Sequence, residues 1–155
     1  DFGVILDGWH ADSAYTFPVG KVSDEARRLL EVTQAALAAG IACCRPGRRL
    51  GDIGNAIQRV IEDAGLSVVR EFVGHGIGRS LHEDPQVPNY GKAGVGPVLE
   101  EGWVLAIEPM VTTGGWETRV LDDNWGMVTA DGSLSAHFEH TVAVTADGPR
   151  ILTGL

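Results

Sequence analysis

Two histidines lie seven positions apart in the stretch GHGIGRSLHEDP, residues 74–85. His75 lies between glycines, which allow unusual φ values and close approach of the backbone, as at a binding site. A turn histidine without a function is the alternative. His82 precedes Glu83 but lacks the second histidine of an H-E-x-x-H zinc motif, so on its own it stays ambiguous.

Two acids near the start of the chain are predicted to face each other. An Asp7-Gly8 turn between β-rich runs predicts a hairpin in which Gly3 pairs with Asp12. Asp1 and Asp12 are then diagonal neighbours on one face, with Cα atoms roughly 7–8 Å apart. Two carboxylates so placed repel each other unless a cation lies between them. Solvated acids on an exposed hairpin face are the alternative.

Two further acids lie in or beside apolar strands. Glu108 follows the run WVLAI, where a charge is costly unless it is paired or coordinated. Glu139 lies in SAHFEHTVAV, on the opposite strand parity from Phe138 and Val142. A solvent-facing acid on an edge strand is the alternative for Glu139. Four carboxylates with one or two imidazoles can bind two hard-to-borderline divalent ions, so the sequence predicts a dinuclear metal site.

The other histidines have simpler interpretations. His10 and His137 are predicted to be partly exposed strand residues. His140 has the opposite parity from Glu139 and is predicted to form hydrogen bonds on the core side.

Composition indicates one globular domain. The chain has 155 residues, 44% of them apolar, and a net charge of −9 that argues against a nucleic-acid surface. No apolar run approaches the roughly 18 residues of a membrane span, and no secretory signal is visible. The only two cysteines, Cys43 and Cys44, are adjacent and ill placed to bond to each other. We therefore expect reduced thiols and a cytoplasmic location.

The periodicity of the chain predicts an α+β fold that positions these side chains. The opening hairpin is followed by a helix from Ser23 to near Cys44 and another from about Leu50 to Ala64. A largely antiparallel sheet should follow, with the helices on one face. Its predicted strands are 68–73, 103–107, 110–113, 118–121, 126–129 and 136–144.

Five stretches in order resemble the methionine aminopeptidases of the pita-bread fold: DFGVILDGWHAD, GHGIG, LHEDPQV, IEPM and HFEHT. The resemblance runs along the whole chain. It implies a mostly antiparallel curved sheet with helices on its outer face. The short spacing between Glu108 and Glu139 leaves no room for the insertion of the type II enzymes, so the chain resembles type I and a bacterial source is expected.

The resemblance also implies the metal chemistry. It implies two divalent ions, of Co, Mn, Fe, Zn or Ni, with Asp12 and Glu139 bridging them. A metal-bridging hydroxide would attack the scissile carbonyl, while Glu108 shuttles a proton to the leaving amine. The ligands implied by the resemblance are Asp1, Asp12, His75, Glu108 and Glu139.

Three residues are implied to meet the substrate. His82 would contact the scissile peptide and stabilise the tetrahedral intermediate. Trp125 matches an aromatic residue that flanks the family's pocket, although a structural Trp is the alternative. Leu81 occupies a position where relatives commonly carry an aromatic residue.

The implied function is removal of the initiator methionine from nascent proteins when the next side chain is small. The expected partners are the N-termini of nascent polypeptides, with the ribosome as a further candidate. No contact with nucleic acid or a membrane is expected. The protein is expected to be a monomer. Residues 1–155 are expected to form a catalytic pita-bread domain that lacks most of its N-terminal half. A proline-specific peptidase of the prolidase or aminopeptidase P type and a catalytically silent binding module are the alternatives.

Overall fold

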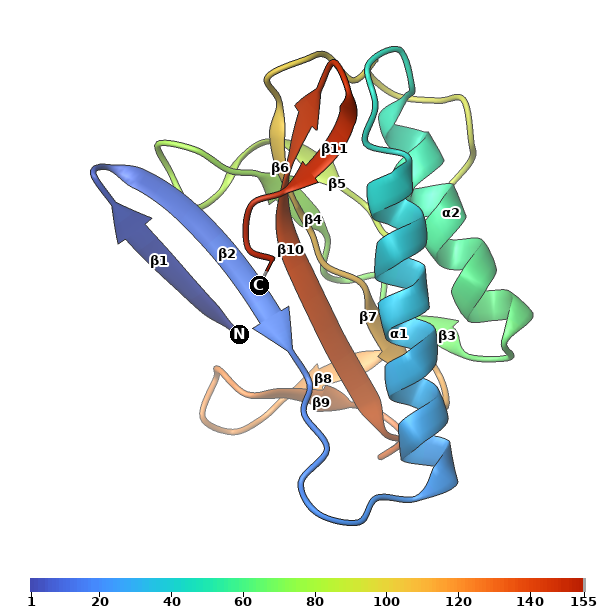
Figure 1. The fold of residues 1–155 in the computed structure, drawn as a ribbon. Coiled ribbons are helices and arrows are strands. Elements are labelled where there is room, and N and C mark those ends of the chain that lie inside the picture. Colours follow the sequence, from blue (N-terminus) through green and yellow to red (C-terminus); the bar gives the residue numbers. More distant parts are fainter. Residues whose placement is uncertain (155) are drawn as a thin grey trace.

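Two helices cover one face of a mostly antiparallel sheet (Figure 1). The protein is described by a computed structural model that covers residues 1–154. No helix in that range is both long and apolar enough to cross a membrane. In chain order the elements are β1 (Phe2–Leu6), β2 (Trp9–Tyr15), α1 (Asp24–Ala42), α2 (Leu50–Asp63), β3 (Ser67–Val68), β4 (Gly74–Gly76), β5 (Glu83–Val87), β6 (Val104–Ile107), β7 (Met110–Thr112), β8 (Thr118–Val120), β9 (Met127–Thr129), β10 (Ser135–Thr145) and β11 (Gly148–Ile151).

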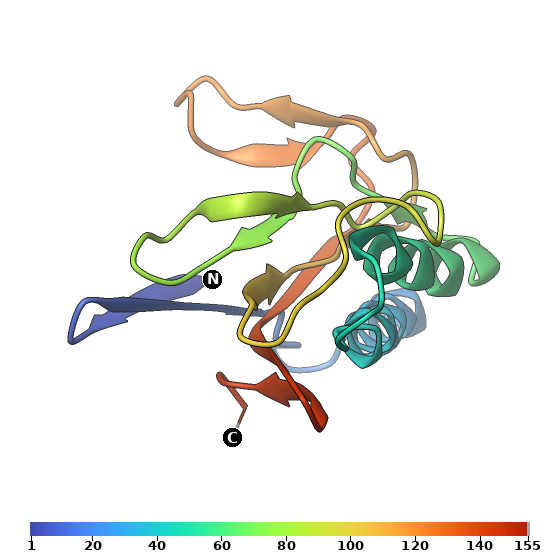
Figure 2. The same cartoon turned by 90° about the horizontal axis from the view of Figure 1, so that it is seen from above.

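Strand β10 organises the sheet. Its 11 residues pair with β2, β6, β7 and β11. The main path through the sheet runs β1-β2-β10-β6-β4-β5, while β8 and β9 form a separate two-stranded sheet. Seen from above, the β1–β2, β4–β5 and β8–β9 hairpins project in the same direction, away from the helices (Figure 2). The sheet therefore presents one face to the helices and another beneath these hairpins.

Both helices begin and end close to the predicted residues. The Ser23 side chain accepts a hydrogen bond of 3.1 Å from the backbone N–H of Ala26, and thereby caps α1. Gly65 follows the C-terminal cap of α2 with a φ of 72°, a left-handed conformation that glycine adopts easily.

The core lies between the helices and the sheet. Ile53, Ile57 and Ile61 repeat at helical spacing on one face of α2 and are completely buried. They belong to one apolar cluster with side chains of α1 and of strands β6, β7 and β10. The α+β fold expected from the sequence is confirmed.

The strand predictions are right for the hairpin and for β6 to β10 but wrong elsewhere. In the opening hairpin Gly3 pairs with Asp12 and Leu6 with Trp9, as the turn predicts. The predicted strand over 68–73 ends at Val68, because only residues 67 and 68 pair with β7. Strands β4, β5 and β11 were not predicted. Their sequences GHG, EDPQV and GPRI have low β-propensity, so these strands depend on their neighbours in the sheet.

Close packing of α2 against the segment after β5 explains a glycine within that helix. A Cβ on Gly54 would overlap the carbonyl oxygen of Pro88 and lie 2.6 Å from that of Tyr90. Backbone carbonyls cannot move aside as a flexible side chain does. The glycine is thus a requirement of packing, not of backbone conformation.

Gly54→Ala is expected to lower the free energy of unfolding by about 1–3 kcal/mol, because the overlap outweighs the roughly 1 kcal/mol that alanine gains in helix propensity. Urea unfolding measures this change. Arg59→Ala, an exposed position on the same helix, is the control and should change stability by about 0.5 kcal/mol or less. A Gly54→Ala protein as stable as the parent would contradict the packing argument.

Candidate metal centre

The register of β2 and β10 places two predicted ligands on one face. Glu139 of β10 pairs with Ala14 of β2, and Asp12 lies two residues before Ala14, so both acids point to the same side. The hydroxyl of Thr141 fixes this pairing, because it accepts from the Asp12 N–H at 2.9 Å and donates to the Asp12 carbonyl at 2.8 Å. Asp12 is 8% and Glu139 2% exposed.

Strands β6 and β4 continue the same face. Ala106 of β6 pairs with Thr141 on one side and with His75 of β4 on the other, so these three residues share a face. Glu108 lies two residues after Ala106, beside Glu139 in the extended register, and joins that face. Four strands thus deliver four of the predicted ligands to one place.

His75 lies in a buried strand, and this corrects the expectation of unusual backbone angles around it. It is 7% exposed, and neither Gly74 nor Gly76 has a positive φ. The glycines are required for close approach instead. A Cβ on Gly74 would overlap the carbonyl oxygen of Ala106, and one on Gly76 would overlap that of Asp84. The alternative of a turn histidine does not apply.

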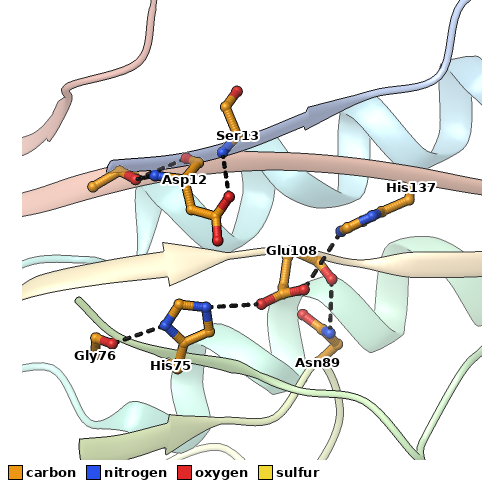
Figure 3. A network of polar contacts seen from close by, with 8 residues as sticks. Asp12, Ser13, His75, Gly76, Asn89, Glu108 and His137 are labelled. Carbon is orange, nitrogen blue, oxygen red and sulfur yellow. Dashed lines mark hydrogen bonds and ion pairs between the residues drawn. The ribbon is translucent and has the colours of Figure 1, made fainter. Parts of the chain in front are cut away.

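Hydrogen bonding orients the His75 ring. Its Nδ1 lies 2.8 Å from the carbonyl oxygen of Gly76, which can only accept, so Nδ1 carries the proton in the neutral ring. The unprotonated Nε2 lies 3.5 Å from Glu108 Oε1 (Figure 3). Two lone pairs face each other at this distance, and a cation between them removes the repulsion.

The donors form two groups that share Glu139. In each group one ligand atom per residue lies within 4.8 Å of the others. The first group comprises Asp12, His75 and Glu139, and the second Glu108, His137 and Glu139. The structure does not bring Asp1 into either group: it is exposed and lies on the wall of the adjacent pocket.

Burial makes the charge of Glu139 costly without a cation. Desolvation, followed by the charges of Glu108 and Asp12, raises the pKa of Glu139 from 4.5 to about 9. Its Oε1 is buried without a hydrogen-bond partner among the described residues. An orphaned oxygen amid carboxylates and imidazoles fits a divalent ion, which restores the charged form.

Further hydrogen bonds hold the ligands in place. Asp12 Oδ1 accepts a bond of 3.0 Å from the Ser13 N–H. Buried Asn89 donates through Nδ2 to the Glu108 carbonyl at 3.1 Å and thereby fixes the backbone that carries this ligand. Such supporting bonds orient metal ligands in proteins.

A pocket of about 600 Å³ adjoins the donors, and the two histidines of the GHGIGRSLHEDP stretch meet on its wall. Exposed His82 lies with its ring centroid 4.4 Å from that of His75. Trp125, 88% exposed, also lines the pocket. Leu81 is not among the lining residues and lies against β1, where a Cβ on Gly3 would be 3.3 Å from its Cδ1.

Sequence reasoning missed His137. It is a partly exposed strand residue, as the sequence predicts, but the sequence alone does not indicate that its Nε2 lies 3.5 Å from Glu108 Oε2. The available signal was parity, since His137 and Glu139 are two residues apart on one strand.

The predicted core-side role fits His140, which is half-buried with its Nδ1 2.9 Å from the hydroxyl oxygen of Thr153.

A sheet of this topology with carboxylates and imidazoles gathered on its inner face defines the pita-bread class of metal-dependent proteins. The model of metallopeptidase family M24 matches residues 1–146, and the chain belongs to this family. The solved methionine aminopeptidase of Thermotoga maritima superimposes with a TM-score of 0.97 at 48% identity, over 99% of this chain and 61% of that one. The prolidase of Pyrococcus furiosus, at 22% identity and a TM-score of 0.74 over 99% of this chain and 40% of its own, shares the fold.

Curated relatives carry the same name. The methionine aminopeptidase of Clostridium perfringens is 55% identical and methionine aminopeptidase 1 of Bacillus subtilis 54%, each over 99% of this chain. The chain spans about three fifths of the length of these relatives, 61% and 62%.

In the metal-free protein, Glu139 should make stability depend on pH. The unfolded chain ionises this carboxyl near pH 4.5 and the folded protein only near pH 9, so its contribution to stability is complete below pH 4.5 and is lost as the pH rises through 9. Glu139→Gln is therefore expected to stabilise the metal-free protein at pH 8, by on the order of 2 kcal/mol, and to have little effect at pH 4.5.

Urea unfolding in the presence of a chelator, at several pH values, measures this difference. Exposed Glu31→Gln on α1 is the control and should show no such trend. A difference between Glu139→Gln and the parent that does not grow with pH would contradict the argument.

Proposed function

We propose that the protein is the metal-dependent catalytic unit of a methionine aminopeptidase, which removes the N-terminal methionine from proteins. The observation that carries the proposal is the pair of donor groups that share buried Glu139 beside an open pocket. The names of the relatives at about 50% identity supply the substrate. The prolidases share only the fold with this chain at 22% identity, so they give no support to a proline-specific peptidase.

The proposed centre holds two divalent ions, of Co, Mn, Fe, Zn or Ni. They would be held by Asp1, Asp12, His75, Glu108 and Glu139, with Asp12 and Glu139 as the ligands common to both. When bound, the ions would supply an activated water as nucleophile and polarise the scissile carbonyl. Asp1, which precedes β1 and lines the adjacent pocket, would join the set from the pocket side.

The chain's own residues would position the substrate and move the proton. Glu108, at the end of β6, faces the pocket and can pass a proton from the attacking water to the leaving amine. His82, on the same wall, would donate a hydrogen bond to the developing oxyanion. Trp125 would lie along the bound peptide, whereas Leu81 would act only by supporting the wall that carries His82.

The setting of the reaction belongs to the same proposal. The proposed partners are the N-termini of nascent polypeptides, and the ribosome is a further proposed partner. The proposed location is the cytoplasm. The proposed oligomeric state is a monomer. We propose that residues 1–155 lack most of the N-terminal half of a pita-bread fold. The share of the relatives that is matched supports this assignment, and so do the apolar side chains of Phe2, Ile5 and Leu6, each more than 60% exposed on β1.

Methionine release from a Met-Gly peptide tests the function. The chain alone is expected to be slow, because a pocket without one wall positions the carbonyl poorly. Fusion to the part of the Bacillus subtilis relative outside the match should raise the rate at least about 100-fold, and a chelator should abolish it. A Gly-Pro peptide is the control substrate. Preference for Gly-Pro, or a metal-loaded fusion without any peptidase activity, would contradict the proposal.

The two histidines of the GHGIGRSLHEDP stretch should differ in their effects. In the fused protein, His82→Ala is expected to keep metal but lower kcat by roughly 100-fold, the cost of one oxyanion donor. His75→Ala should lose metal, because it removes a ligand. Atomic absorption after gel filtration measures the bound metal. An equal loss of metal in both variants would show that the roles are assigned wrongly.

A further inference from the structure

A second imidazole lies on the donor face of β10. His137 pairs with Met110 of β7 and lies two residues before Glu139, so both side chains leave the strand on the same side. In the extended register Glu139 opposes Glu108, which makes His137 a diagonal neighbour of Glu108. Its ring points at the Glu108 carboxylate from the side opposite His75 (Figure 3).

The contact between His137 and Glu108 is not a hydrogen bond. Nε2 of His137 lies 3.5 Å from Glu108 Oε2, beyond the range of about 2.7–3.2 Å for N–H···O bonds. The side chain is 24% exposed, but Nε2 itself is buried and has no hydrogen-bond partner among residues 1–154. A buried polar atom without a partner requires an explanation.

A shared cation supplies that explanation. His137 offers a ring nitrogen within 4.8 Å of a carboxylate oxygen of Glu108 and of Glu139, and Oε1 of Glu139 is itself buried and unpartnered among the described residues. The same 3.5 Å spacing separates His75 Nε2 from the other Glu108 oxygen. Glu108 thus has one imidazole beside each oxygen, and the contact with His137, which belongs to the same donor group, has the length expected of two ligands around one ion.

We propose that His137 is a ligand, through Nε2, of the metal ion that Glu108 and Glu139 hold. The inference rests on the metal-dependent function proposed above and adds a sixth side chain to the five ligands of that proposal. It gives each ion one imidazole, His75 in the group with Asp12 and His137 in the group with Glu108. Both groups remain joined through Glu139.

The added nitrogen donor changes which ions the second group prefers. Carboxylates alone suit hard cations such as Mg²⁺ and Mn²⁺, whereas imidazole suits Co²⁺, Ni²⁺ and Zn²⁺. With His137 as a ligand, both groups select borderline ions. His137→Gln leaves the second group with oxygen donors and should shift its preference toward Mn²⁺.

Co²⁺ titration of the metal-free chain tests the proposal. Equilibrium dialysis counts bound Co²⁺, and visible absorption reports the ligands around it. His137→Gln is expected to weaken one of two bound ions at least about tenfold and to change the spectrum of that ion only, while Mn²⁺ affinity falls less. His137→Ala should weaken the same ion, which guards against an effect peculiar to glutamine.

The matched control is His140→Gln, on the same strand, whose ring bonds to Thr153 on the other face. This variant should bind Co²⁺ like the parent. Circular dichroism establishes that each variant is folded. A parent chain that binds no Co²⁺ would overturn the metal centre as a whole. A parent that binds two ions, with both His137 variants matching it in affinity and spectrum, would overturn only the role of His137.

Discussion

The cost of burying several carboxylates close together is the constraint on which this site depends. Asp12, Glu108 and Glu139 converge beneath three hairpins, and burial together with the two neighbouring charges raises the pKa of Glu139 to about 9. Water would relieve this repulsion on an open surface. Here Asp12 and Glu139 are buried, so the electrostatic cost of the site falls when a proton or a metal ion binds.

Strand β10 carries both the core and the site. Phe138, Val142 and Val144 point toward the helices and are buried in the apolar cluster, while His137 and Glu139 point to the donor face. Packing of β10 against α1 therefore fixes where His137 and Glu139 lie along the strand and the direction in which they point. Because successive side chains of a strand point to opposite faces of the sheet, one strand can contribute to the apolar core on one face and to a charged site on the other.

Local chemistry explains which features the sequence predicts. The Asp7-Gly8 turn sets the register that pairs Gly3 with Asp12, and Ser23 marks the start of α1, because each signal acts over a few residues. The strand at His75 is different: its GHG sequence favours a turn, and only the backbones of β5 and β6 make it a strand. Parity places His137 on the same side of the strand as Glu139, but its contact with Glu108 could not be predicted, because Glu108 belongs to a different part of the chain.

The four donor segments are far apart in the chain, and this has a mechanical consequence. Asp12 and Glu139 are 127 positions apart, with His75 and Glu108 between them. An ion bound by these side chains is a reversible cross-link that closes loops spanning most of the protein. Closing long loops restricts the unfolded chain, and binding to the folded form alone stabilises it further. Metal supply would then govern how long the protein resists unfolding and proteolysis, as a disulfide does in secreted proteins.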